Sequence, residues 1–205
     1  MGVLAAADGK AHWITAPPVE PVTKAHVGYR SKQASSVEAA KWVQIDLAET
    51  QTIDAVRLWP TWPLEPGVAA GGGFPVRFKV EVSAQADFAQ PRTVVDRTGA
   101  DVPNPGMASV KLDFAPTQAR FVRLTATPLS GPSKPVWDEE KQNWRAEPVG
   151  RGVWLALAEM EVLGGGRNLA RGKPVTAQDE WDDSPPAVAT GPRQPRVRGL
   201  WSREQ

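Results

Sequence analysis

The fold of this chain is indicated by the stretch Trp42-Val43-Gln44-Ile45-Asp46-Leu47, which is followed from residue 53 by Ile53-Asp54-Ala55-Val56-Arg57-Leu58. In both runs apolar and polar residues alternate, which is the period of a β-strand with one face in a core and the other in water. The two runs therefore predict two antiparallel strands of a sandwich. Because a slip of one residue would exchange the two faces, the same pattern predicts the register.

Further alternating runs predict more strands, at residues 74–82, 93–96, 109–114, 120–127 and, as the last strand, 157–163. The chain has 20 prolines and 18 glycines, and prolines interrupt helical hydrogen bonding, so an all-β, antiparallel two-sheet β-sandwich with long loops is predicted. The residues expected in its core are Val43, Ile45, Leu47, Val56, Leu58, Phe78, Val80, Val122, Leu124 and Met160, together with Trp42 at a strand start. Those expected to face water are Gln44, Asp46, Lys79 and Glu81.

The composition limits the number of domains and the class of partner. A chain of 205 residues can form one sandwich with residues left over, but hardly two. With 24 basic and 23 acidic residues it has no overall field to attract nucleic acid or an anionic membrane, and no apolar run approaches the roughly 20 residues of a membrane helix. The absence of cysteine excludes disulfides and thiolate sites. We therefore expect a soluble, monomeric module without a nucleic-acid or membrane partner.

Five segments occur in a recognisable order: W-V-Q-I-D-L, the strand from residue 53, F-K-V-E-V-S from residue 78, A-R-F-V-R-L from residue 119 and A-L-A-E-M-E-V from residue 156. Over residues 29–163 this order resembles the discoidin domain, also called the coagulation factor V/VIII C-type domain. With G-F-P-V-R-F from residue 73 and the turn Asn104-Pro105-Gly106, the chain is similar to modules attached to bacterial α-L-rhamnosidases and other large secreted bacterial proteins. The resemblance implies a galactose-binding-like, jelly-roll sandwich that binds a ligand and is not catalytic.

The chain divides into four predicted parts. Residues 1–25 are expected to be an irregular lead, in which Val3-Leu4-Ala5-Ala6-Ala7 has the small residues of an export-signal cleavage site. Residues 26–163 form the sandwich. Residues 164–177 contain N-L-A-R-G-K-P-V-T-A, which resembles the first strand of a discoidin domain, so this part is either the start of a truncated second module or a closing strand of the first. Residues 178–205 are rich in Pro, Arg and Gly and are expected to be a disordered tail. The expected location is extracellular or periplasmic.

Tryptophans in the predicted loops are candidate binding residues, because an exposed indole offers a flat apolar face to a pyranose and an N–H donor at its edge. Loops at one end of a sandwich also collect binding groups. The candidates are Trp62, just after a strand end, and Trp137, Trp144 and Trp154, in or beside the predicted loop over residues 128–152. The alternative for each indole is a small hydrophobic cluster that stabilises the loop itself.

Tyr29 and Arg30 precede the W-V-Q-I-D-L strand at a position where, by the resemblance, discoidin domains carry groups near their binding end. Arg30 could instead pair with a carboxylate. Because the loops carry no excess of one charge, the ligand is predicted to be a neutral glycan. The predicted site is a single loop end that contains Tyr29, Arg30, Trp62, Trp137, Trp144 and Trp154.

A calcium ion is a further expectation that depends on the resemblance. In many discoidin-like sugar-binding domains the Ala-Glu of the closing strand contributes to a structural calcium site, and Ala158-Glu159 matches it. Calcium takes six to eight oxygen ligands, and the Asp-Gly pair that supplies others in the family is missing from residues 13–25. The alternative is that Glu159 is an exposed residue on an outward strand face.

The chain is not expected to be an enzyme. Its two histidines, His12 and His26, precede the predicted core, and no Ser or Asp motif beside them suggests a catalytic triad or metal cluster. The function predicted is a non-catalytic carbohydrate-binding accessory module, a piece of a larger exported bacterial polysaccharide-degrading protein. The alternatives are a structural module between domains without a ligand, or a protein-interaction or adhesion module.

Overall fold

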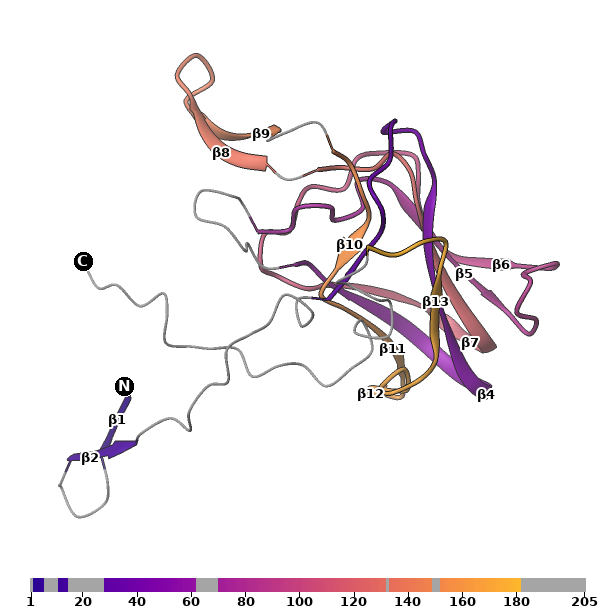
Figure 1. Cartoon of the computed structure of the whole chain (residues 1–205). Coiled ribbons are helices and arrows are strands. Elements are labelled where there is room, and N and C mark those ends of the chain that lie inside the picture. Colours follow the sequence, from indigo (N-terminus) through magenta and orange to yellow (C-terminus); the bar gives the residue numbers. More distant parts are fainter. Residues whose placement is uncertain are drawn as a thin grey trace.

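The computed structural model describes residues 2–5, 11–14, 28–61, 70–131, 133–148 and 152–181. Within these ranges every regular element is a β-strand, as the prolines and alternating runs predict (Figure 1). None of the described segments is a helix long and apolar enough to span a membrane.

The strands are β1 (Gly2–Ala5), β2 (Ala11–Ile14), β3 (Tyr29–Arg30), β4 (Lys41–Trp59), β5 (Phe78–Ser83), β6 (Arg92–Arg97), β7 (Val110–Ala126), β8 (Ser133–Asp138), β9 (Asn143–Pro148), β10 (Ala156–Leu157), β11 (Glu159–Gly164), β12 (Arg167–Asn168) and β13 (Val175–Ala177). All of their pairings are antiparallel. The pair β1–β2 lies within the part of the chain that was expected to be an irregular lead.

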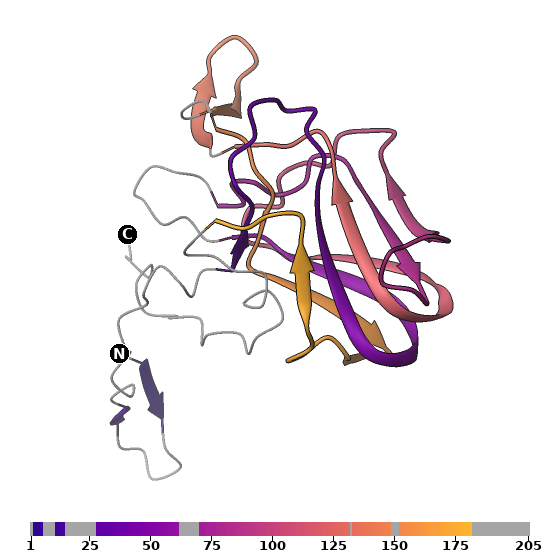
Figure 2. The same ribbon diagram turned by 45° about the vertical axis from the view of Figure 1, so that its right-hand side comes forward.

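Two long strands, β4 and β7, build both layers of the sandwich and pair with each other in both halves. Their register shifts between Asp46 and Gln51, where Ala48 has a positive φ of 72°. The Asp46 carboxylate accepts a hydrogen bond from the Ala48 N–H at 2.8 Å, which supports this turn. Both strands bend together here, so that their halves lie in different layers (Figure 2). One layer contains β13, β4, β7, β5 and β6, and the other contains β12, β11, β4 and β7.

The two alternating runs that predict the fold thus belong to one bent strand instead of two. Residues 42–47 lie in the first half of β4 and residues 53–58 in its second half, and the partner of both halves is β7. The alternation correctly identified the buried face of each run. It carries no information on whether the chain between them leaves the sheet or continues to pair with a neighbour.

The core lies between the two layers. All ten of the strand residues predicted to fill it, from Val43 to Met160, are at most 1% exposed. They belong to β4, β5, β7 and β11, so residues from four strands meet in one cluster. The predicted register is confirmed.

The outer face of the first layer is more covered than the alternation predicts. The Arg123 Cζ lies 4.7 Å from the ring centroid of Trp42 and 3.9 Å from that of Phe88. Its Nε and Nη2 donate hydrogen bonds to Gln44 Oε1 at 3.0 and 2.6 Å. Gln44 and Glu81 are therefore only 7% and 8% exposed although they point away from the core. Trp42 lies on this outer face, so its expected core position is wrong, because its neighbour Val43 takes the inward direction.

The C-terminal strands belong to the same sheet system. Val175 of β13 lies opposite Ile45 of β4, and β12 pairs with β11. Residues 157–163 are consequently not the last strand. The segment 164–177 has the place of a closing strand of this sandwich, which is the second of the two alternatives for it. The first residues of the predicted tail, 178–181, are also ordered against the sandwich, through hydrogen bonds such as Gln178 N–H to the Trp42 carbonyl at 3.1 Å.

Candidate functional site

Tyr29 is brought to the candidate site by β3, which pairs with β10. It is fully buried, and its hydroxyl donates a hydrogen bond to the backbone carbonyl of Asp179 at 3.0 Å. Burial, followed by the negative charges of Asp179 and Glu180, raises the pKa of Tyr29 well above its usual range. Tyr29 is therefore a neutral core residue, and the ligand contact predicted for it stays a prediction.

Arg30 is the centre of an aromatic cluster. Its Cζ lies 3.9 Å from the ring centroid of Trp154 and 4.5 Å from that of Trp181. Burial lowers the pKa of the Arg30 guanidinium, but the group stays cationic because an arginine pKa begins so high. Its Nε is buried and has no hydrogen-bond partner among the described residues. Within the part of the chain that the structure describes, the cation is held by ring faces, and no carboxylate there pairs with it.

Trp154 is packed against the body of the sandwich. Its backbone forms an isolated bridge with Ser130. A Cβ placed on Gly73, which has a positive φ of 82°, would lie 2.6 Å from the Trp154 Cδ1, so the indole edge needs a glycine there. Gly152 approaches the Cζ3 end of the same ring in a similar way. Trp154 is therefore partly buried, and its ring face contacts the Arg30 guanidinium.

The segment 178–181 crosses over this cluster and was assigned to a disordered tail by sequence reasoning. Asp179 is its anchor: Oδ1 accepts a hydrogen bond from the Lys32 N–H at 2.9 Å, and Oδ2 pairs with the Lys41 ammonium. Lys41 is only 6% exposed, so Asp179 neutralises a nearly buried charge. The backbone N–H of Trp181 then donates a hydrogen bond to the Arg30 carbonyl at 2.8 Å.

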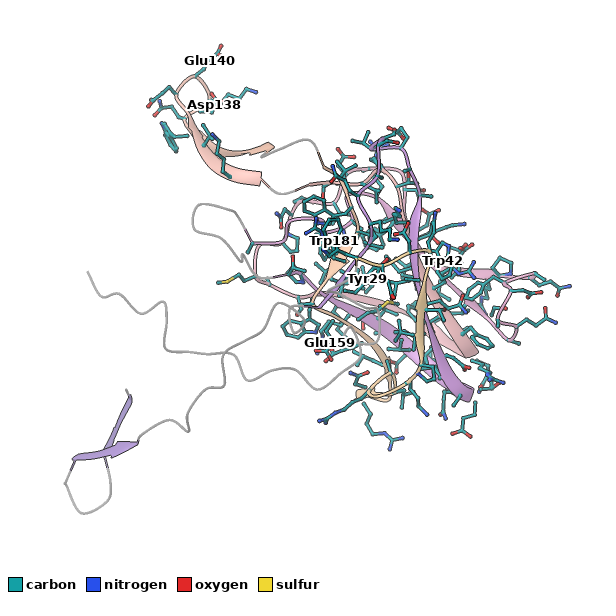
Figure 3. All side chains as sticks on the ribbon, in the orientation of Figure 1. Tyr29, Trp42, Asp138, Glu140, Glu159 and Trp181 are labelled. Carbon is teal, nitrogen blue, oxygen red and sulfur yellow. The ribbon has the colours of Figure 1, made fainter. Side chains whose placement is uncertain are left out.

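Trp181 is the residue of this site that sequence reasoning missed. It is 40% exposed, and Figure 3 shows it beside Tyr29. The available signal was a tryptophan within a run of four acidic residues, Asp179, Glu180, Asp182 and Asp183.

Two of the other predicted tryptophans belong to a different element. Trp137 lies on β8, opposite Trp144 of β9, in a hairpin that replaces the predicted long loop. Figures 1 and 2 show this hairpin projecting from the sandwich, and Asp138 and Glu140 mark its tip in Figure 3. The hairpin pairs with itself. The common loop end stays a prediction, because one of its members, Trp62, lies outside the described residues.

Trp137 is 38% exposed, and Trp144 is placed here only by its strand register. Trp62 lies outside the described residues.

Glu159 is not the exposed residue on an outward strand face that the alternative assumed. It is 6% exposed, so it is not a surface residue, and its Oε1 accepts a hydrogen bond from Asn168 Nδ2 at 3.4 Å. No group of three or more His, Cys, Asp or Glu side chains in the described ranges is arranged to hold a metal ion. The described residues around Glu159 do not by themselves fit calcium, which takes six to eight oxygens. A calcium role for Glu159 remains a prediction, and residues 15–27, which would have to add ligands, lie outside the description.

The cluster offers two kinds of contact to a ligand. Trp181 is a large apolar side chain that is 40% exposed to solvent. Beside it, the guanidinium of Arg30 has N–H groups, which can only donate hydrogen bonds. Ring surface and donors together suit a molecule with C–H faces and oxygen acceptors.

The fold and the site define an antiparallel β-sandwich with an aromatic and cationic cluster beside a strand end. The sequence profile of the F5/8 type C domain matches residues 4–144, which is more than half of the 205 residues. The chain belongs to the F5/8 type C domain family, and the resemblance to discoidin domains is confirmed.

Similar solved structures include CBM32-1 of a family 31 glycoside hydrolase from Clostridium perfringens, with 14% identity, coverage of 71% of this chain and 87% of the other, and a TM-score of 0.43. A chitosan-binding module 1 of a chitosanase/glucanase from Paenibacillus sp. IK-5 has 18% identity, coverage of 66% and 76%, and a TM-score of 0.41. CpGH89CBM32-5 from Clostridium perfringens, in complex with GalNAc-β-1,3-galactose, has 18% identity, coverage of 62% and 68%, and a TM-score of 0.40. No curated protein is a significant match.

Proposed function

We propose that this chain is a non-catalytic carbohydrate-binding module. The observation that carries the proposal is the Arg30 cation held over Trp154 and Trp181 beside a strand end of the sandwich. An indole with an exposed surface next to fixed hydrogen-bond donors is the combination that recognises a pyranose, which has an apolar C–H face and polar hydroxyl groups. The family to which the chain belongs is in accord with a binding role.

A neutral glycan is the ligand class that we propose. The chain has a net charge of only +1, and the nearly buried ammonium of Lys41 is already neutralised by Asp179. The remaining cation of the site, Arg30, lies over ring faces. A polyanion would need several uncompensated cations on one surface, since charge complementarity drives such binding.

The finer parts of the proposal concern the whole protein. We propose a monomeric module of a larger exported bacterial polysaccharide-degrading protein, located outside the cell or in the periplasm. A shallow site binds a single sugar only weakly, around millimolar, which is about 4 kcal/mol. Attachment to a larger protein with several modules would raise the retention on a polymer without new contacts.

The β8–β9 hairpin favours one alternative, a protein-interaction module. It projects from the sandwich (Figure 3). Its Trp137 is 38% exposed. An exposed tryptophan on a protruding element is a common anchor of protein interfaces. The two functions use different parts of the molecule and can therefore be separated by mutation.

The test is binding of the purified chain to an array of immobilised neutral and acidic oligosaccharides, followed by retention on the matching polysaccharide. We expect binding to neutral glycans. Changing both Trp137 and Trp144 to Ala tests the hairpin: lost retention with an unchanged melting temperature would place it in the glycan contact. Absence of binding to any glycan would contradict the proposed function, and selective binding to acidic glycans would contradict the ligand class.

A further inference from the structure

The segment 178–181 is fixed to the sandwich by hydrogen bonds and an ion pair. Tyr29 and Lys32 each donate a hydrogen bond to Asp179, at 3.0 and 2.9 Å, and Lys41 pairs with its carboxylate. Two of these three partners, Tyr29 and Lys41, are buried. The anchor is therefore part of the folded domain, and the residue two positions later is held in one place.

Trp181 is the residue that this anchor positions. Its backbone N–H donates a hydrogen bond to the Arg30 carbonyl at 2.8 Å, and its ring centroid lies 4.5 Å from the Arg30 Cζ. An ordinary structural indole would be expected to bury most of its surface, as Trp154 does against Gly73 and Gly152. Trp181 instead keeps 40% of its surface exposed, although its backbone is fixed on the domain. A ligand that covered this exposed surface would remove apolar area from water, which is favourable.

Arg30 adds the polar half of the same surface. The contacts of its guanidinium in the described part of the chain are the two rings, and its buried Nε has no hydrogen-bond partner there. A guanidinium can only donate hydrogen bonds, so Arg30 suits a ligand that brings oxygen acceptors. A sugar ring that stacks on Trp181 would bring hydroxyl and ring oxygens next to these donors.

We propose that Trp181 is the stacking contact of the glycan site, delivered by the C-terminal segment and fixed by Asp179. This inference rests on the proposed carbohydrate-binding function and names the residue that carries it. It moves the centre of the site from the tryptophans of the hairpin to the Arg30 cluster. The ligand class is a neutral oligosaccharide with an exposed pyranose C–H face.

The experiment compares the unchanged chain with Trp181→Ala, Trp181→Phe and Lys111→Ala on an array of immobilised neutral oligosaccharides. Lys111 is the matched control, because it is an exposed residue of β7 outside the cluster. We expect Trp181→Ala to weaken binding at least about tenfold, which is about 1.4 kcal/mol. Trp181→Phe should retain part of the binding because a ring face remains, and Lys111→Ala should bind like the unchanged chain.

A second measurement separates a stacking role from a structural one. Acrylamide quenching of tryptophan fluorescence should decrease when the best glycan of the array is added, and this protection should be smaller in Trp181→Phe. Full binding by Trp181→Ala, or equal protection in Trp181→Phe, would overturn the assignment and leave the proposed function intact. If the unchanged chain binds no glycan on the array, both the proposed function and this inference are wrong.

Discussion

Truncation of Leu124 tests the packing of the two layers. Leu124 is fully buried on β7, and its neighbours in the sheet are Val43 of β4 and Val80 of β5, which are also fully buried. Because strands flank it on both sides, the backbone cannot close the space that Leu124→Ala would leave. Leucine-to-alanine changes at such sites lower the free energy of unfolding by about 3 to 5 kcal/mol through lost burial and the residual cavity.

The expected loss for Leu124→Ala is about 3 kcal/mol, which corresponds to a decrease in melting temperature of about 6 to 12 °C for a domain of this size. Urea unfolding followed by tryptophan fluorescence measures it as a lower midpoint with an unchanged slope. The control on the same strand is Lys111→Ala. The side chains of Lys111 and its partner Asp113 are 47% and 69% exposed, so this change should stay within about 0.5 kcal/mol. A loss below about 1 kcal/mol for Leu124→Ala would refute the placement of this face in a packed core.

Two further predictions concern titration and metal binding. Hydrogen bonds from Arg120, at 2.9 and 3.0 Å, are the main cause of a lowered pKa for Asp46. The stabilisation of the folded state by the Asp46–Arg120 pair is therefore present above the pKa of Asp in the unfolded chain. It is lost as the pH falls through the lower pKa of Asp46 in the folded state. Asp46→Asn should lower stability by up to about 1 kcal/mol at pH 7, and the difference should shrink below about pH 4 in urea titrations; a difference independent of pH would contradict the charge argument. For Glu159, whose carboxylate contacts Asn168, we expect no change in melting temperature with millimolar calcium or with chelator; an increase with calcium that Glu159→Gln abolishes would assign it as a ligand, since binding to the folded state stabilises it.

The strand interiors were predictable because burial imposes a period of two on the sequence. Val43, Ile45 and Leu47 alternate with polar residues, and all three are buried in the core. The fold class followed from such runs and from the family resemblance. Within the runs, the predicted exposure was wrong where the polar face of a strand is also covered. Gln44 is buried beneath Arg123, which lies far from it in the sequence.

The candidate site was only partly predictable for a related reason. Arg30 and Trp154 were recognised as residue types suited to binding. The structure brings them together, with the Arg30 Cζ 3.9 Å from the ring centroid of Trp154. Trp137 was recognised on the same grounds, but its strand pairs with β9 in a hairpin apart from the cluster. Residue type and loop position indicate chemistry, whereas proximity depends on pairings between distant segments.

The sequence by itself determined the all-β class, the inward and outward faces of the strands and the family, because alternation and short motifs are local properties of the chain. Only the tertiary structure decided that β4 and β7 each serve both layers, that β13 closes the sheet beside β4, and that Asp179 holds Trp181 against Arg30. These features join residues that lie far apart in the sequence, up to 150 positions for Tyr29 and Asp179. Their partners are chosen by burial and charge neutralisation in the folded state, and no spacing within a single segment records that choice.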